Sequence, residues 1–197
     1  VMDAAVSPDS RSVAVLTMGL SDGTFACRID LYRLDSSGGD EPDWSCSLDN
    51  NTVLGLRWDS DGIWALGESA LTLVSPNGTV TGSCPYNGYH LKSFSLNGED
   101  SAALLLGKYR AGSSSELATV SPDGSVRARL ELEEQVLSLA AAGHYVAVLT
   151  ADRLDVYNLD LKLYASLEGT RGARQVILRD DGTALLVGAD SARLFIP

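Results

Sequence analysis

Two histidines could act as general bases near neutral pH in this 197-residue chain, because imidazole ionises in that range. His90 falls in an expected loop and His144 in an expected turn. Neither histidine is tied to a serine or a cysteine by the spacing of a known motif, so a hydrolytic triad has no support. The sequence therefore predicts no catalytic residue.

Acidic residues at two turns have the spacing that begins a calcium-binding loop. Asp59 and Asp61 precede Gly62, and a similar group occurs at 180–182. A loop of the EF-hand type also needs a glutamate at its twelfth position, and residue 70 is alanine. Because Asp and Gly are the residues that tight turns require, we expect hairpin turns at both places. No metal site is predicted.

The three cysteines, Cys27, Cys46 and Cys84, lack the Cys-x-x-Cys spacing of zinc and redox sites. With only two histidines in the chain, neither a zinc site nor a disulfide framework is supported. We expect three thiols in strands, buried or half-buried. No cofactor is predicted.

Aromatic and basic residues recur in the loops between strands. In a repeat of antiparallel strands, the loop from an outer strand to the next inner strand shares a face with the loop between the second and third strands. Tyrosine and arginine on one loop face are typical of recognition surfaces. The alternative is that these are solvated loops of separate repeats that never converge. The predicted binding rim consists of Tyr86, Tyr89, His90, Lys108, Tyr109, Arg110, Arg171 and Arg174.

Other surface residues carry less functional meaning. Glu131, Glu133 and Glu134 form an acidic rim, which more often serves solubility than binding. Asn50 and Asn77 match the N-glycosylation acceptor pattern, which recurs often by chance.

Three stretches of equal length predict β-hairpins. Residues 117–130 contain Ser-Pro-Asp-Gly between two apolar strands, and residues 71–84 contain Ser-Pro-Asn-Gly at the same place. These residues favour a turn because Pro presets φ, Asp or Asn bonds nearby backbone, and Gly accepts a positive φ. Residues 154–167 repeat the pattern of strands.

The remaining segments also have strand periodicity. Residues 28–34 alternate with period two, and residues 13–16 read as a short buried strand. Polar loops are expected at 19–24 and 35–43. The segment closest to a helical pattern is 131–142, but its Leu-x-Leu spacing predicts a strand.

The strand groups recur at intervals of about 40–45 residues, which is the signature of four-stranded propeller blades. The segments 29–35 and 154–160 share four of seven residues at matched positions. We predict an all-β, propeller-like array of about four and a half four-stranded antiparallel blades. The predicted single domain covers residues 1–197, with blades at 1–49, 50–87, 88–135 and 136–171 and an incomplete blade at 172–197.

The net charge of −11 argues against nucleic-acid binding, which needs a basic face. It also argues against adsorption to an anionic membrane surface. No apolar run approaches the roughly 20 residues of a membrane-spanning helix.

Turns of the Ser-Pro-Asp-Gly type followed by an Ala-Val-Leu type strand resemble bacterial propellers of the WD-like and YVTN-like kind. Residues 136–149, 152–157 and 182–194 are similar to the C-terminal part of an uncharacterised family of membrane-anchored bacterial proteins. The resemblance implies an N-terminal membrane helix outside this chain and an extracytoplasmic location in the intact protein. It implies no known activity and no functional residues.

An incomplete ring leaves sheet edges open, because a propeller removes its edges by closing. The chain starts at Val1 within an expected strand, so we also expect it to be a piece of a longer protein. A second copy is expected to cover the open edges, giving a homodimer.

Two functions are compatible with this sequence. The first is a non-catalytic scaffold that binds a protein partner or a cell-surface ligand. The second is a propeller enzyme or carbohydrate-binding domain with a dispersed central site, which a single sequence can hide. A deep pocket with converging carboxylates would favour the second.

Overall fold

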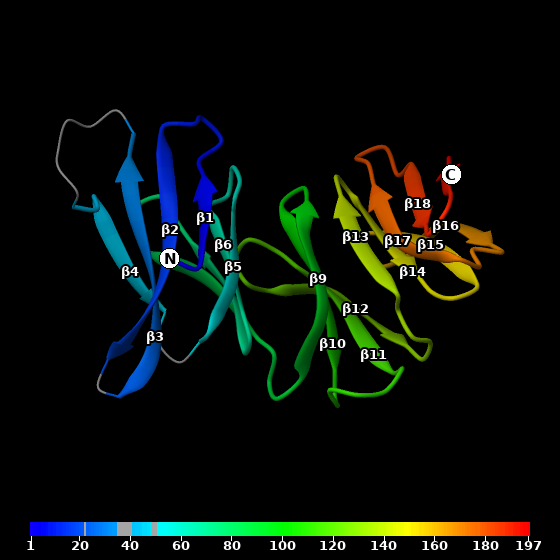
Figure 1. Ribbon diagram of the computed structural model, residues 1–197, viewed down its shortest axis with the longest axis horizontal. Coiled ribbons are helices and arrows are strands. Elements are labelled where there is room, and N and C mark those ends of the chain that lie inside the picture. Colours follow the sequence, from blue (N-terminus) through cyan, green and yellow to red (C-terminus); the bar gives the residue numbers. More distant parts are fainter. Residues whose placement is uncertain (22, 35–40, 49–50) are drawn as a thin grey trace. The chain divides into compact units, whose positions relative to one another are not determined.

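The computed structural model describes residues 1–21, 23–34, 41–48 and 51–197. Within these ranges all regular secondary structure is β-strand, and the strands form four four-stranded sheets and one three-stranded sheet (Figure 1). Every sheet is an antiparallel meander whose strands follow one another in sequence. The prediction of an all-β array of about four and a half antiparallel blades is confirmed.

The chain divides into two compact units, of which the first comprises residues 1–87 and 122–125 and the second residues 88–121 and 126–197. The first unit contains two sheets. Their strands are β1 (Asp3–Val6), β2 (Ser12–Ser21), β3 (Thr24–Arg33) and β4 (Trp44–Leu48), then β5 (Val53–Trp58), β6 (Ile63–Gly67), β7 (Ala70–Val74) and β8 (Val80–Pro85).

The second unit contains three sheets. The first two consist of β9 (His90–Gly98), β10 (Ser101–Gly107), β11 (Ser115–Val120) and β12 (Val126–Leu132), then β13 (Ser138–Ala142), β14 (Tyr145–Leu149), β15 (Arg153–Asn158) and β16 (Leu163–Glu168). The last sheet consists of β17 (Ala173–Leu178), β18 (Ala184–Gly188) and β19 (Ala192–Phe195). The prediction that the whole chain is a single domain stays a prediction.

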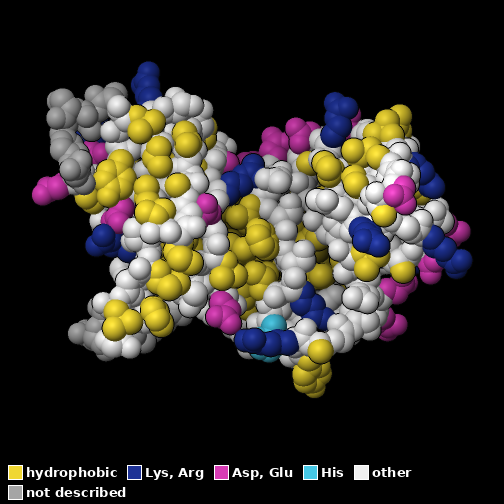
Figure 2. Space-filling view, in the orientation of Figure 1, with side chains coloured by type: hydrophobic (Ala, Val, Ile, Leu, Met, Phe, Trp, Pro, Cys, Tyr) yellow, Lys and Arg dark blue, Asp and Glu magenta, His cyan; other side chains and the backbone are white. Residues whose placement is uncertain are grey.

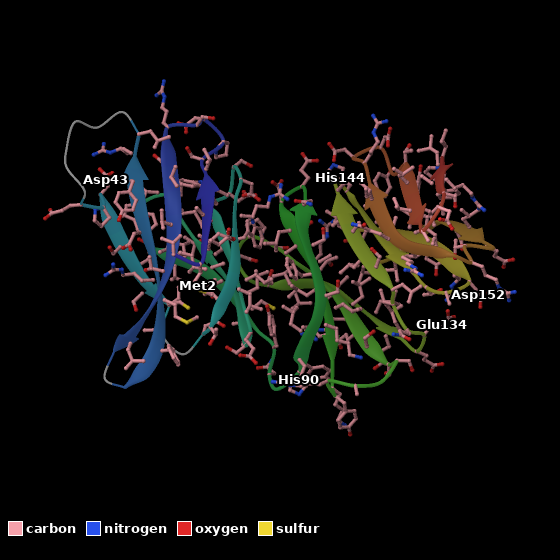
Figure 3. The ribbon with its side chains drawn as sticks, viewed as in Figure 1. Met2, Asp43, His90, Glu134, His144 and Asp152 are labelled. Carbon is pink, nitrogen blue, oxygen red and sulfur yellow. The ribbon has the colours of Figure 1, made fainter. Side chains whose placement is uncertain are left out.

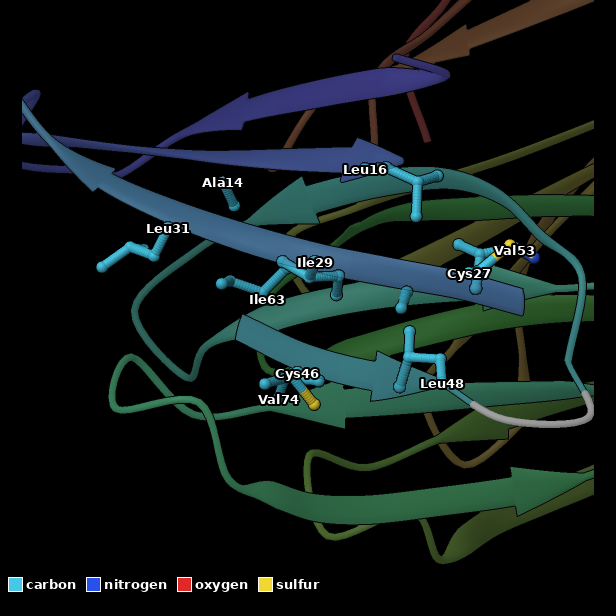
Figure 4. Close-up of a cluster of buried hydrophobic side chains, with 11 residues drawn as sticks. Ala14, Leu16, Cys27, Ile29, Leu31, Cys46, Leu48, Val53, Ile63 and Val74 are labelled. Atoms are coloured by element: carbon cyan, nitrogen blue, oxygen red, sulfur yellow. Dashed lines mark hydrogen bonds between the residues drawn. The ribbon is translucent and has the colours of Figure 1, made fainter. Parts of the chain in front are cut away.

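The core of the first unit lies between its two sheets. Short apolar strands such as β6 contribute to it, and every residue of β6 is buried. Figure 4 shows this cluster, in which Leu16 and Ile29 of the first sheet and Ile63 and Val74 of the second are almost completely buried. Cys27 and Cys46 belong to the same cluster, and Cys84 is buried in β8. The prediction of buried strand thiols is confirmed.

Two apolar clusters fill the second unit. One includes Leu105 and Leu117 of the first sheet together with Val148 of the next. The other includes Leu149 and Leu186 of the last two sheets. Because β14 alternates sides, its successive residues Val148 and Leu149 serve different clusters, and this explains why the strand reads as a continuous apolar run.

The innermost strands of the second unit lie side by side. β13 contacts β9 on one side and β17 on the other, and all three run in the same direction (Figure 1). Gly98 and Gly143 form a parallel bridge, and the Glu99 amide donates to the Gly143 carbonyl at 2.8 Å. Gly143 has a φ of +51°, and a Cβ there would lie 2.9 Å from the Asp180 carbonyl oxygen. Glycine is therefore required where these turns meet.

Buried aspartates stabilise one blade in each unit. In β3, Asp30 is 2% exposed, accepts a hydrogen bond from the Ser45 hydroxyl at 2.6 Å and pairs with Arg28 at 2.9 Å. The same three residue types recur in the second unit, again on the third and fourth strands of a sheet. These are Arg153, Asp155 and Ser166.

The structure corrects three local predictions. The polar loop expected at 19–24 is wrong, because β2 and β3 continue through most of it and only a tight turn remains, with Gly23 at a φ of +80°. His90 begins β9 and does not lie in a loop. Arg174 lies in β17, not in the loop before it. Most of the loop expected at 35–43 lies outside the described residues.

Candidate binding face on the loops of the second unit

One face of the second unit gathers loops from all three of its sheets. Because β9, β13 and β17 are parallel and each sheet is an antiparallel meander, their starts lie at the same end as the ends of β10, β14 and β18. We call this end the loop face. It comprises residues 88–93, 108–115, 133–138, 150–153, 169–174 and 188–192. In Figure 3, His90, Glu134 and Asp152 of this face lie below His144, which belongs to the opposite end.

A hollow of about 370 Å³ opens on the loop face, and we call it the cationic hollow. Lys92 and Arg110 contribute positive charge to its wall, and none of the lining residues is acidic. The complete lining is Lys92, Ser93, Leu105, Arg110, Ala111, Gly112, Ser113, Ser115, Gln135, Val136, Leu137 and Ser138. The volume lies within the range of small-ligand pockets.

Lys92 fixes the loop that covers one side of the cationic hollow. Its ammonium group donates hydrogen bonds to the carbonyl oxygens of Gly112 at 2.8 Å and Ser114 at 3.0 Å. Beneath this loop Ser115 is 6% exposed, and its hydroxyl has no hydrogen-bond partner within the part of the chain that the structure describes. On the far wall the Ser138 hydroxyl accepts the Val176 amide at 3.2 Å, which links the hollow to β17.

A smaller hollow of about 170 Å³ opens on the same face at the last sheet. The loop at 169–172 forms one wall, and Arg193 of β19 contributes to the other. Arg171 also lines this hollow, but its guanidinium pairs with Asp152 at 2.9 Å. The hydrogen bond to the Asp152 carboxylate raises the pKa of Arg171 above its ordinary value. Thr170 is 4% exposed and its hydroxyl has no partner.

Most predicted rim residues lie on this face. Tyr89 is 38% and Tyr109 68% exposed, and the Lys108 ammonium lies 5.9 Å from the centre of the Tyr109 ring. His90 pairs across the sheet with Gly107, directly before Lys108. Figure 2 shows basic side chains beside a histidine and hydrophobic side chains along the lower edge of the second unit.

Of the predicted rim residues, two line hollows, one lies exposed on a strand and one is buried. Arg110 lines the cationic hollow and Arg171 the smaller one, while Arg174 is exposed on β17. Tyr86 is only 2% exposed, so its side chain does not contribute to an exposed rim. Burial raises the pKa of the Tyr86 hydroxyl above its ordinary value, and this hydroxyl has no hydrogen-bond partner among the described residues.

The sequence interpretation missed Lys92, Gln135 and Ser138 as wall residues of the hollow. Lys92 sits in a strand, where alternation predicts only that it faces away from the core. Gln135 and Ser138 flank the start of an inner strand and carry no motif. A search for isolated cations at strand starts would have found Lys92, whereas no sequence signal identifies the other two.

Two acidic residues on the loop face have an arginine partner. Glu134 pairs with Arg153 at 3.3 Å, and Asp152 pairs with Arg171. The two units also differ in charge, because residues 1–87 and 122–125 carry four Lys or Arg and thirteen Asp or Glu, whereas residues 88–121 and 126–197 carry eleven and thirteen. The second unit therefore has the smaller excess of negative charge.

The opposite end of the second unit consists of short acidic turns. His144 lies there, 71% exposed and 3.3 Å from Glu99. The hydrogen bond from Arg127 lowers the pKa of Asp160, and those from the backbone and side chain of Thr183 lower the pKa of Asp181. These carboxylates serve turns and ion pairs at the protein surface.

Nothing in the described residues assembles a catalytic site from the two histidines. His90 and His144 lie at opposite ends of parallel strands in the second unit. Residues 19–23 match the Gly-x-Ser-x-Gly pattern of hydrolases, so the sequence interpretation that this pattern is absent is wrong. That motif requires a strand-to-helix turn, whereas Gly19 and Ser21 lie in β2, which pairs with β3 in antiparallel fashion.

The aspartates considered for calcium serve turns. Asp59 accepts hydrogen bonds from the Asp61 amide at 3.0 Å and from the Trp64 indole at 2.7 Å. Asp181 accepts the Thr183 amide at 2.9 Å. The prediction of hairpin turns at both places is confirmed.

No protein-family profile and no curated protein sequence matches the chain. Solved structures do match. BamB from Moraxella catarrhalis is 16% identical, with a TM-score of 0.54 over 96% of this chain and 56% of that chain. Sqt1 from Chaetomium thermophilum, bound to the N-terminus of the ribosomal protein L10, is 17% identical, with a TM-score of 0.58 over 96% and 57%. The WD40 repeats of RRP9 are 11% identical, with a TM-score of 0.55 over 95% and 73%.

These likenesses establish a β-propeller type of fold, in agreement with the sequence prediction. The chain spans little more than half the length of the BamB and Sqt1 chains that it matches. Among the described residues, no helix is long and apolar enough to cross a membrane.

Proposed function

We propose that the chain is a non-catalytic binding module that recognises a protein partner through the loop face of its second unit. The observation that carries this proposal is the convergence of two hollows and six exposed aromatic or basic residues on one end of three adjoining sheets. The six are Tyr89, Lys108, Tyr109, Arg110, Arg171 and Arg174.

The chemistry of this face suits protein recognition. Tyrosine offers a large rigid surface with few torsions to fix, and arginine offers several donors on a planar group. Exposed Tyr109 projects from the loop between β10 and β11, where backbone and side chain can meet a partner together. The Sqt1 structure, which shares the fold, contains a bound peptide segment of another protein, and this supports the proposal.

Three finer features belong to the same proposal and come from the sequence resemblance. The intact protein carries a membrane anchor outside this chain, it is bacterial, and its propeller lies on the extracytoplasmic side. A homodimer through open blade edges is a further part of it. In its support, β19 has no strand on its outer side among the described residues, and Ile177 and Leu194 of the last sheet are exposed.

Selection of peptides from a displayed random library tests the main proposal. The affinity of an enriched peptide is measured by titration calorimetry for the wild-type chain and for the double variant Tyr109→Ala/Arg110→Ala. Because truncation of interface hot spots costs about 2 kcal/mol or more, we expect the affinity to fall at least roughly 30-fold.

The matched control changes the same residue types at the opposite end of the second unit, as Tyr164→Ala/Arg179→Ala. Tyr164 is 53% exposed in β16, and Arg179 is exposed after β17. The control should bind the peptide as the wild type does. Enrichment of peptides that lose affinity only in the control variant, or no enrichment at all, would reject the loop face as the binding surface.

A further inference from the structure

The charge of Lys92 is compensated differently from that of the arginines in ion pairs. Seven arginines have a carboxylate partner within 4.0 Å, namely Arg28, Arg33, Arg127, Arg129, Arg153, Arg171 and Arg179. Lys92 is half-buried and has no ion pair among the described residues. Its neighbours are two backbone carbonyls, which carry dipoles but no net negative charge.

An ammonium group has three N–H donors, and two of those of Lys92 go to the carbonyls of Gly112 and Ser114. The third donor is left for the cationic hollow, which Lys92 lines. A partly desolvated charge without a counter-charge is unfavourable. An anion in the hollow would therefore accept a hydrogen bond from Lys92 and compensate its positive charge.

The rest of the lining is consistent with an anion and not with a cation or an apolar ligand. Arg110 adds a second positive charge, and the wall contains no Asp or Glu. Ser93, Ser113 and Gln135 add neutral hydrogen-bonding groups. Charge-assisted hydrogen bonds from Lys or Arg to an oxyanion are roughly twice as strong as bonds between neutral groups.

We infer that the cationic hollow is a binding site for a single oxyanion, of the size of phosphate, sulfate or a carboxylate, held between Lys92 and Arg110. The shared chemistry is a compact anionic group with several acceptor oxygens. A free inorganic ion and a phosphorylated or acidic side chain of a partner both carry it. The inference does not depend on the proposed function, because a free ion can fill the site without any protein partner.

The smaller hollow provides a comparison within the same unit. Arg171 lines it, but its charge is already compensated by Asp152 at 2.9 Å. Only Arg193 remains there without a carboxylate partner among the described residues. In the cationic hollow the Lys92 ammonium is held in place by two carbonyls, and we therefore place the oxyanion there.

The test is a titration of the ¹⁵N-labelled chain with inorganic phosphate at low salt, followed by amide chemical shifts. We expect saturable shifts at 110–115 and 135–138, with a midpoint on the order of 1 mM. Added sodium chloride should weaken binding because it screens the charges.

Parallel titrations use N-acetyl phosphoserine amide and acetate. If the phosphoserine derivative binds more tightly than inorganic phosphate, the site takes a phosphorylated side chain of a partner. If it binds equally or more weakly, the site takes the free ion.

Lys92→Gln should weaken phosphate binding at least about tenfold, because one charge-assisted bond is lost. Lys162→Gln removes an exposed lysine at the opposite end of the unit and should change nothing. If Lys92→Gln does not fold, Arg110→Gln provides the same measurement from the other wall. Absence of saturation up to about 20 mM, or an equal loss in Lys162→Gln, would show an adventitious ion only and would overturn the inference.

Discussion

The second unit contains two sheltered charges with opposite surroundings. Asp155 is 6% exposed and has three side-chain partners, the Ser166 hydroxyl at 2.6 Å, the Tyr157 hydroxyl at 3.3 Å and the Arg153 guanidinium at 2.9 Å. Lys92, at the cationic hollow, is bonded to backbone carbonyls alone. The first charge is fully compensated by the fold, and the second is not.

This difference separates a structural group from a candidate binding group. The arrangement around Asp155 recurs around Asp30 in the first unit, so it follows the repeat and connects neighbouring strands wherever it occurs. Lys92 instead makes its two hydrogen bonds to backbone carbonyls. We infer that the recurrent, fully paired aspartates have a structural role, and that Lys92, a charge beside a hollow without a carboxylate partner in the described residues, is a candidate binding group.

The largest expected effect comes from Asp155→Ala. Removing a buried carboxylate leaves the Ser166 and Tyr157 hydroxyls without this acceptor, so we expect a loss of about 3 kcal/mol in the free energy of unfolding. The matched control is Asp152→Ala, which removes an exposed carboxylate with 69% side-chain exposure. It should change stability by less than about 0.5 kcal/mol. Urea unfolding followed by circular dichroism measures both.

The same variant tests whether the units unfold together. All three tryptophans, at positions 44, 58 and 64, belong to the first unit, whereas Asp155 belongs to the second. If the chain is the single domain that the sequence predicts, the tryptophan fluorescence midpoint of Asp155→Ala shifts together with the dichroism midpoint. An unshifted fluorescence transition would contradict that prediction.

The next effect is a loss of stability at high pH. Burial, and secondly the negative charge of Asp155, raise the pKa of Tyr157 to about 12, whereas an unfolded tyrosine ionises near 10. Because the folded-state pKa is the higher one, the free energy of unfolding should fall as the pH rises from about 10 to 12, by roughly 1–2 kcal/mol. Tyr157→Phe should lose this part of the pH dependence. Parallel pH curves for variant and wild type would contradict the account.

The smallest effects distinguish satisfied from unsatisfied hydroxyls. Ser166→Ala removes a hydroxyl that donates to Asp155 at 2.6 Å and should cost about 1 kcal/mol. Ser115→Ala removes a buried hydroxyl without a partner and should leave stability unchanged or raise it by up to about 1 kcal/mol. Thermal unfolding of the two variants compares them directly. Similar destabilisation by both would mean that the Ser115 hydroxyl has a partner in solution.

Much of the fold follows from the sequence because turn chemistry and period-two alternation are local properties. The Pro-Asn-Gly and Pro-Asp-Gly turns at 76–78 and 122–124 mark hairpins whatever their surroundings. The segment 19–24 was misread because its glycines suggested a loop. Asp22-Gly23 is itself a two-residue hairpin signal, and the strands on both sides of it extend to this turn.

The candidate site was only partly predictable. The choice of loop face depended on strand order, which the repeat supplies, and most rim residues do lie there. Whether a loop residue points outward depends on packing that no local pattern encodes, so buried Tyr86 was placed on the rim. Lys92 was missed because its importance lies in what surrounds it, two carbonyls and no carboxylate, and these come from segments about twenty residues away.

The most direct test of the loop face is hydrogen exchange of the chain with and without a library-selected peptide. We predict slower exchange at 88–93, 108–115, 133–138 and 169–174, with no change in the turns at 99–100, 159–162 and 180–183 of the opposite end. Protection confined to those opposite turns, or to the first unit, would contradict the claim that the second unit binds its partner through the loop face.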